Sequence, residues 1–313
     1  MKILVTGSWG FLGRHVQKIL RECHQVEDLL FPNSNELDCT KAGQVNDYID
    51  DYRPDVVVHL AALVGGIGAN MARPADFWYQ NLLMGMNVIE ACKDTGVRRI
   101  VMTATTCGYP KSPKTIPFIE EEFFDGYPEE TNAPYGIAKR CLVAGLDAYM
   151  KQYGLRSVSL IPTNLYGPGD NCDSETSHVV PAMIRKAVQA RDSGTTLKLW
   201  GTGTPTRDFL YVEDAARAVV RAVGEWMCPS MSINLGSGRE TSIDELAETV
   251  SRIVGFEGRI EYDYSKPDGQ PRRVLDSERA ATYLRWKAET SLEDGLRKTY
   301  DWYVKQMAGA RTQ

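Results

Sequence analysis

A glycine-rich turn follows the first apolar segment of the chain. Residues 2–6, KILVT, predict a buried strand, and TGSWGFLG then places Gly7, Gly10 and Gly13 before the amphipathic segment 11–23. A turn of this kind brings a pyrophosphate close to the backbone at the N-terminus of a helix. A glycine pattern alone is a weak signal. After the first strand of an alternating chain, it favours a dinucleotide site over a bare turn.

Apolar strands and helical segments alternate through the first half of the sequence. Strands are predicted at 28–31, 55–62, 98–105 and 156–167, and helices near 41–52, 74–95 and 134–153. This alternation predicts an α/β fold, a Rossmann-type doubly wound parallel sheet. Continuously apolar strands such as DVVVHLAA fit a sheet that is covered on both faces.

The alternation loosens after residue 166, which predicts a second, smaller unit. We expect residues 1–165 to form the dinucleotide-binding domain, with residues 207–236 returning to it. Residues 166–313 would mainly form an α/β substrate subdomain. Ser242, followed three residues later by Glu245, predicts the start of a helix, and the C-terminal tail is expected to be a less regular cap.

Composition excludes several classes of function. The net charge of -5 over 313 residues gives no basic footprint for nucleic acid. Seven cysteines without a CxxC pair argue against a disulfide framework and a zinc site, and favour a reducing, cytoplasmic setting. No segment approaches the ~18 apolar residues that a membrane span needs. We therefore expect a cytoplasmic protein without metal, nucleic acid or membrane partners.

The segment YGIAK places Tyr135 and Lys139 on one face of a helix. A free tyrosine has a pKa of about 10. A nearby ammonium and the positive nicotinamide ring would favour the tyrosinate, which could exchange a proton with a sugar hydroxyl or carbonyl near neutral pH. Thr105 ends a predicted strand and could donate to the same oxygen. Cys107 follows two residues later, where packing of a small apolar side chain is the alternative explanation.

These motifs together resemble the extended short-chain dehydrogenase/reductase family, whose nucleotide-sugar members carry TGxxGxxG, a Ser or Thr after the fourth strand, and YxxxK. The dehydratases of that family have two carboxylates where this chain has Thr106 and Cys107. Simple 4-epimerases usually have a small residue in place of the cysteine. The segments AALVGGIGAN, NAPYGIAK, LWGTGTPTRDFLYVED and KPDGQPRR are similar to the bifunctional 3,5-epimerase/4-reductases of GDP-linked 4-keto-6-deoxy sugars.

The resemblance implies C3/C5 epimerisation of GDP-4-keto-6-deoxy-D-mannose and NADPH-dependent reduction at C4. Its catalytic set would be Thr105, Cys107, Tyr135, Lys139 and His178. A C4 ketone acidifies the hydrogens on C3 and C5, so a thiolate and an imidazole on opposite sides of the ring could invert both centres. Thr105 and Tyr135 would stabilise the enolate oxygen. For His178, a backbone-bonded loop residue is the alternative.

The resemblance makes residues 1–165 the NAD(P)-binding domain. NADP(H) is preferred and NAD(H) remains possible, because no acid follows the second strand until Glu36. Asn33, Ser34 and Arg14 could meet a 2′-phosphate. The implied cofactor contacts are Gly7, Gly10, Phe11, Leu12, Gly13, Asp38, Ala61, Tyr135, Lys139, Pro162, Asn164, Leu165 and His178.

The GDP-linked 4-keto-6-deoxy sugar would bind mainly to residues 166–313. Arginine suits bidentate contacts with phosphate, and Arg207 is the strongest candidate because its segment matches the family. The expected substrate contacts are Asn164, Arg185, Lys186, Trp200, Arg207 and Arg272. Each basic residue could instead be a solvated surface group, and Trp200 could stack on a base or cover the subdomain.

Two other functions remain open. The chain could act on another nucleotide-linked 4-keto-6-deoxy sugar, such as a heptose or a dideoxy sugar. A cofactor-binding sensor without turnover is a third hypothesis, although a sensor does not need Thr105, Tyr135 and Lys139. The resemblance also implies a homodimer formed through the helices at 74–95 and 134–153.

Overall fold

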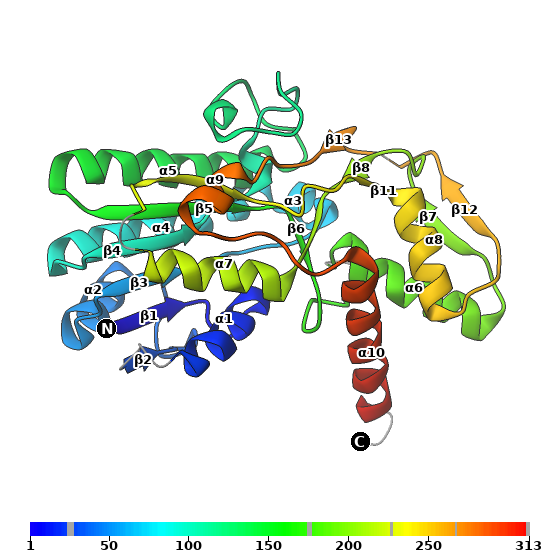
Figure 1. The fold of residues 1–313 in the computed structure, drawn as a ribbon, viewed down its shortest axis with the longest axis horizontal. Coiled ribbons are helices and arrows are strands. Elements are labelled where there is room, and N and C mark those ends of the chain that lie inside the picture. The colour runs from blue at the N-terminus through cyan, green and yellow to red at the C-terminus, as the bar shows by residue number, and fades with distance from the viewer. Residues whose placement is uncertain (24–27, 174–176, 226–227, 267, 311–313) are drawn as a thin grey trace.

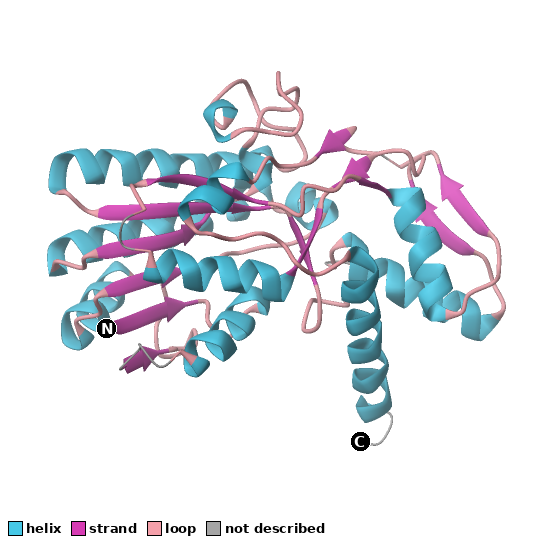
Figure 2. Cartoon of the chain, viewed as in Figure 1, coloured by secondary structure: helices cyan, strands magenta, loops and turns pink. Residues whose placement is uncertain are grey.

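A six-stranded parallel sheet forms the larger part of the molecule, with strand order β10-β5-β4-β3-β1-β2 (Figures 1 and 2). The computed structural model describes residues 1–23, 28–173, 177–225, 228–266 and 268–310. The strands are β1 (Lys2–Thr6), β2 (Asp28–Leu30), β3 (Val56–His59), β4 (Arg99–Thr103), β5 (Arg156–Pro162) and β10 (Met231–Leu235). This arrangement confirms the predicted α/β fold class.

Helices cover both faces of this sheet, as the continuously apolar strands predicted. Ile3 and Val5 of β1 belong to one buried cluster and Leu4 to another, because alternate side chains of a strand point to opposite faces. One face is covered by α1 (Phe11–Glu22) and α7 (Val212–Gly224). The other is covered by α2 (Ala42–Tyr52), α4 (Pro74–Thr95) and α5 (Ala133–Tyr153). The short helix α3 (Ile67–Ala72) was not predicted.

Smaller sheets form the second part of the molecule, at the right of Figure 1. They pair β7 (Leu197–Trp200) with β12 (Ile260–Asp263), β6 (Asn164–Tyr166) with β9 (Phe209–Tyr211), and β8 (Thr206–Arg207) with both β11 (Thr241–Ser242) and β13 (Arg272–Arg273). Helices α6 (Val179–Ser193), α8 (Ile243–Val254) and α10 (Leu292–Ala310) enclose a separate apolar core with them. The Ser242 hydroxyl accepts a hydrogen bond from the Glu245 amide at 3.0 Å, which confirms the predicted start of α8.

The chain crosses between the two parts more than once. Strand β10 pairs with β5 at the edge of the large sheet, and helix α9 (Glu278–Tyr283) with Trp286 adds to the core below it. The division at residue 165 stays a prediction. Positions 226–227 of the returning segment and 267 of KPDGQPRR lie outside the described residues. The expectation of an irregular tail was wrong, because α10 is a 19-residue helix that buries Leu296 and Tyr303.

Among the described residues, no helix has the length and apolar character needed to cross a membrane.

Candidate active site

A cleft of about 850 Å³ lies between the large sheet and the smaller sheets, and most predicted site residues line it. The predicted residues in its lining are Gly7, Gly10, Phe11, Leu12, Gly13, Ala61, Thr105, Cys107, Tyr135, Pro162, Asn164, Leu165, His178, Arg185, Lys186, Trp200 and Arg207. Three predicted residues, Asp38, Lys139 and Arg272, are not among the lining residues. One continuous cleft therefore brings together residues that are far apart in the sequence.

The glycine turn after β1 has the shape that a dinucleotide requires. Gly7 has a φ of +68°, and a Cβ there would lie 2.5 Å from the Ala61 amide nitrogen. A Cβ on Gly13 would lie 2.2 Å from the Gly7 carbonyl oxygen, so the helix can approach the strand only without a side chain. All residues of α1 are described by the structure, and this helix has no side-chain cap at Gly10 and no acid in its first turn. Its first amides are thus available to a pyrophosphate, and these residues fit the cofactor.

The Asp38 side chain bonds within its own loop. Its carboxylate accepts hydrogen bonds from the Thr40 amide at 3.0 Å and the Thr40 hydroxyl at 2.7 Å. These bonds lower the pKa of Asp38, with Lys41 adding to the effect. Its predicted contact with the cofactor remains a prediction.

Thr105, Tyr135 and Lys139 meet where β4 ends against α5. Thr105 hydrogen-bonds Tyr135 through their side chains. Lys139 is buried behind the cleft, where its Nζ donates to the Thr103 carbonyl oxygen at 2.9 Å. Burial lowers the pKa of Lys139 to about 8. One turn apart on α5, Tyr135 therefore places its phenol in the cleft lining, and Lys139 places its amine against the Thr103 carbonyl behind that lining.

The electrostatics of Tyr135 differ from the sequence-based expectation. Burial raises the pKa of Tyr135, the neighbouring Cys107 raises it further, and the Thr105 hydrogen bond opposes both. Lys139 was expected to lower it, but its amine is held by the Thr103 carbonyl. The protein on its own thus keeps the phenol protonated, which is the form that can donate a proton.

Cys107 lies in a 3-10 turn, Thr106–Gly108, that α5 presses against. A Cβ on Gly136 would lie 2.1 Å from the Cys107 carbonyl oxygen. The Cys107 amide donates to the Thr105 hydroxyl oxygen at 3.2 Å, which fixes the turn from inside. The side chain is half-buried and lines the cleft. Interior packing therefore does not account for this thiol.

His178 occupies the N-cap position of α6, and its side chain makes no capping hydrogen bond there. Its Nδ1 lies 3.2 Å from Oδ1 of Asp170, which is buried in the loop after β6. This hydrogen bond and the carboxylate charge raise the pKa of His178 against the opposing effect of burial. The imidazolium is therefore favoured. Sequence analysis missed Asp170, whose only signal was its place in the loop that leads to SHV.

Arg207 on β8 is held by main-chain oxygens and points its charge into the cleft. Its Nη1 donates to the carbonyl oxygens of Thr206 at 2.8 Å and Gln270 at 2.6 Å, and its Nη2 to that of Asp268 at 3.2 Å. Burial and the nearby Arg273 lower the pKa of Arg207 to about 10. An anion from a ligand would relieve both effects.

Trp200 lies at the outer end of the cleft and is 58% exposed. The Nζ atoms of Lys186 and Lys266 lie 5.9 Å and 5.5 Å from its ring centroid. Nearer the sheet, Asn164 donates to the Asp208 carbonyl oxygen at 2.9 Å. These residues extend the lining from the sheet to the subdomain surface.

Adjacent residues of β13 have different surroundings. The Arg272 side chain is exposed and its Nη2 lies 2.5 Å from a Glu240 carboxylate oxygen. Arg273 is buried and lines the cleft, with its Nη1 3.9 Å from the Cys107 sulfur. Alternate residues of a strand face opposite sides. Sequence analysis expected Arg272 among the substrate contacts, but Arg273 is the one of the two that lines the cleft.

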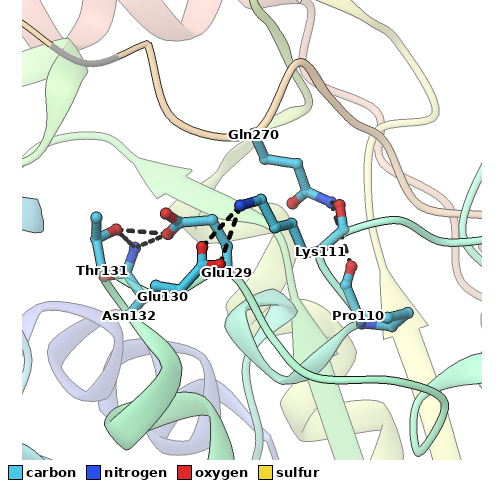
Figure 3. A network of polar contacts seen from close by, with 7 residues as sticks. All are labelled: Pro110, Lys111, Glu129, Glu130, Thr131, Asn132 and Gln270. Carbon is cyan, nitrogen blue, oxygen red and sulfur yellow. Dashed lines mark hydrogen bonds and ion pairs between the residues drawn. The ribbon is translucent and has the colours of Figure 1, made fainter.

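A polar network, shown in Figure 3, borders the cleft on the same side. Gln270 donates to the carbonyl oxygens of Pro110 at 3.3 Å and Lys111 at 2.9 Å. Glu129 and Asn132 belong to a neighbouring group in the same figure, and both line the cleft together with Gln270. Sequence analysis did not single out these three residues.

The family follows from a sequence profile described as the NAD dependent epimerase/dehydratase family, which matches residues 3–236. The chain belongs to this family. As a member it binds NAD(P). The glycine turn, Thr105 and the Tyr135/Lys139 pair all lie within the matched residues.

Individual relatives in this family cover nearly the whole chain. A GDP-L-fucose synthase from Sinorhizobium fredii is 44% identical over 311 residues, which span 98% of this chain and 96% of the relative. A solved GDP-L-fucose synthetase from Naegleria fowleri bound to NADP is 32% identical, with a TM-score of 0.87 over 99% of this chain and 94% of that one. A GDP-6-OMe-4-keto-L-xylo-heptose reductase from Campylobacter jejuni is 28% identical, with a TM-score of 0.89 over 97% and 98%.

Proposed function

We propose that this protein converts GDP-4-keto-6-deoxy-D-mannose to GDP-L-fucose, by inverting C3 and C5 and then reducing the C4 carbonyl. The observation that carries the proposal is that Cys107, the Thr105–Tyr135 pair and His178 line one cleft. The relative from Sinorhizobium fredii, whose name states this activity, supports the substrate at 44% identity.

The C4 carbonyl oxygen of the sugar would lie between the hydroxyls of Thr105 and Tyr135. Both are donors at the end of β4 and the start of α5, and the protein alone keeps Tyr135 protonated. Two donors aimed at one oxygen stabilise the negative charge that develops there when a neighbouring C–H bond is broken. They thereby make the hydrogens on C3 and C5 acidic enough to remove.

Cys107 and His178 would exchange the protons. The Cys107 thiolate takes the proton from a carbon beside the carbonyl, which leaves an enolate and a thiol. The His178 imidazolium donates a proton to the opposite face of that carbon, which restores the ketone and leaves a neutral imidazole. Exchange with water returns both groups to their starting forms. Asp170 favours the imidazolium that this step needs.

Reduction would use the same carbonyl in the same position. NADPH supplies the hydride when bound. Tyr135 gives its proton to the C4 alkoxide. Lys139 would have to turn its amine from the Thr103 carbonyl toward the cleft to hold the cofactor ribose. The preference for NADPH over NADH is supported by the NADP-bound relative.

The GDP part would lie along the outer wall of the cleft. Arg207 is the buried cation placed to meet the diphosphate, and Arg185 and Lys186 line the cleft beside it on α6. Trp200 offers an exposed ring on which a base can stack. The hydroxyls and carbonyl of the sugar then extend toward Cys107.

The experiment that tests this function supplies the keto-sugar with NADPH or NADH in heavy water. We expect deuterium at C3 and C5 and one NADPH oxidised for each GDP-L-fucose formed. Cys107→Ser should slow exchange by about 100-fold or more while largely sparing hydride transfer. Cys141→Ser, an exposed cysteine outside the cleft lining, is the matched control.

The other hypotheses are outcomes of the same experiment with a substrate panel. Turnover only with a heptose or dideoxy keto-sugar would give the chain that substrate, a possibility favoured by the fold likeness to the heptose reductase. Cofactor binding without turnover of any keto-sugar would indicate the sensor. Normal exchange by Cys107→Ser would remove the thiol from the mechanism.

The protein would act as a homodimer. Helices α4 and α5 pack side by side and leave large apolar side chains exposed on the outer surface, namely Trp78, Tyr79, Met86, Met150 and Tyr153. A second copy that covers this face would remove these side chains from water. Light scattering after size-exclusion chromatography would measure the mass in solution, and a monomer mass would contradict the proposal.

A further inference from the structure

Arg273 is a buried arginine that the proposed steps do not use. It is 8% exposed, and its Nε donates to the Gln270 side-chain oxygen at 3.1 Å. Gln270 is 5% exposed, and its amide donates to the carbonyl oxygens of Pro110 and Lys111 (Figure 3). These two carbonyls lie just after Cys107 in the chain. Gln270 therefore ties the guanidinium of Arg273 to the segment that carries the thiol.

The charge of Arg273 is not balanced by a carboxylate. Within the described ranges, no Asp or Glu carboxylate oxygen lies within 4 Å of the Arg273 or Arg207 guanidinium, although the charges of Asp268 and Glu129 act on Arg207 from farther away. The two cations are close enough that Arg273 lowers the pKa of Arg207. Two buried cations that no carboxylate contacts directly are unfavourable, so this corner of the cleft favours an anion.

The Cys107 sulfur is the group that Arg273 reaches, with Nη1 and Sγ 3.9 Å apart. We propose that Arg273, held by Gln270, is a positioning residue that supplies the counter-ion for the Cys107 thiolate. The inference rests on the proposed function, in which that thiolate removes the proton from the sugar. At such a separation an opposite charge favours the ionised thiol.

The other charged and titratable groups around Cys107 are consistent with this assignment. Tyr135 from α5 is kept protonated and carries no charge. Arg207 from β8 interacts with the same thiol and adds a second positive charge. Asp268 and Glu129 are the acids that interact with Arg207, and the effect of Asp268 is the larger. Arg273 is the cation that contacts the sulfur, whereas these two acids act on Arg207.

The test is the pH dependence of Cys107 alkylation by iodoacetamide in the full-length protein, with the modified peptide quantified by mass spectrometry. Arg273→Gln should move the inflection to higher pH and slow alkylation at pH 7 by about tenfold. Arg273→Lys should keep most of the wild-type rate because it keeps the charge. Arg272→Gln is the matched control and should leave the profile unchanged, because its partner is Glu240. An unchanged inflection in Arg273→Gln would overturn the proposal.

A second variant covers the case in which Arg273→Gln does not fold. Gln270→Met leaves the guanidinium in place but removes the group that holds it, and should shift the inflection in the same direction by less. The profile of this variant also decides the proposal, since an inflection identical to wild type would show that the Gln270 contact has no effect on the thiol.

Turnover separates the inference from its closest rival, in which Arg273 only binds the diphosphate. We expect Arg273→Gln to lower deuterium uptake relative to hydride transfer with little change in KM. A raised KM together with an unchanged alkylation profile would show that Arg273 serves the diphosphate, and would overturn the proposal. The alkylation assay needs no nucleotide sugar. If the thiol profile shifts as expected but no keto-sugar is converted, the proposed function fails and the Arg273–Cys107 pair stands.

Discussion

The two walls of the cleft hold their functional residues in different ways. On the inner wall, Thr105 and Tyr135 are fixed between the end of the large sheet and α5, with apolar packing on both sides of the strands. On the outer wall, Arg207 comes from a two-residue strand and is fixed by main-chain oxygens of three residues. Under the proposed function, the inner wall serves the reacting carbonyl and the outer wall serves nucleotide affinity.

The strongest test of the inner wall is Tyr135→Phe. Removing the hydroxyl deletes the proton donor for the alkoxide, so kcat for NADPH oxidation should fall by roughly 10²- to 10⁴-fold. The packing of the ring against Phe77 should remain. Stopped-flow absorbance of NADPH measures the rate, and cofactor fluorescence checks that binding is kept. A variant with nearly normal kcat would show that another group protonates C4.

The matching test of the outer wall is Arg207→Gln. Loss of charged hydrogen bonds to the diphosphate, each worth about 1.5–3 kcal/mol, should raise KM for the nucleotide sugar by about 10- to 100-fold. kcat should change much less than in Tyr135→Phe, because the reacting carbonyl is not touched. Steady-state kinetics at saturating NADPH give both constants. A fall in kcat with constant KM would contradict the assignment of Arg207 and the outer wall to nucleotide affinity.

The substitution with the smallest expected effect is Asp170→Asn, which should change the pH dependence of deuterium exchange and not its maximal rate. Asp170 raises the pKa of His178, so the imidazolium persists to higher pH than in a free histidine. Deuterium exchange should be lost as the pH rises through this raised pKa, and Asp170→Asn should move that loss to lower pH. Asparagine keeps an oxygen for the Asn171 amide, which now donates to Asp170 at 2.8 Å. If exchange by Asp170→Asn were lost at the same pH as in the wild type, His178 would not be the proton donor.

The sequence predicted the features that depend on local pattern. The alternation of strands and helices, the glycine turn and the spacing of Tyr135 and Lys139 all follow from periodicity and backbone geometry, so they did not need tertiary information. The resemblance to a family then supplied Cys107 and His178, which no pattern would have assigned.

The features that the sequence did not predict depend on contacts between distant segments. Asp170 matters because the chain returns it to His178, and Arg273 matters because β13 brings it to Cys107. Strand parity could not choose between Arg272 and Arg273 without knowing which face of β13 meets the cleft. The burial that raises the pKa of Tyr135 in the protein alone was not visible in the sequence, and the expected tyrosinate beside a bound nicotinamide ring stays a prediction.

The close contact between Gly136 and the Cys107 carbonyl couples the position of Cys107 to that of α5. Helix α5 carries Tyr135 and also packs against the turn that carries Cys107, so one helix fixes the positions of both side chains. A substitution that displaces α5 would therefore move Tyr135 and Cys107 together. Under the proposed function, the order of epimerisation and reduction would then depend on the sugar and not on a movement of Tyr135 relative to Cys107.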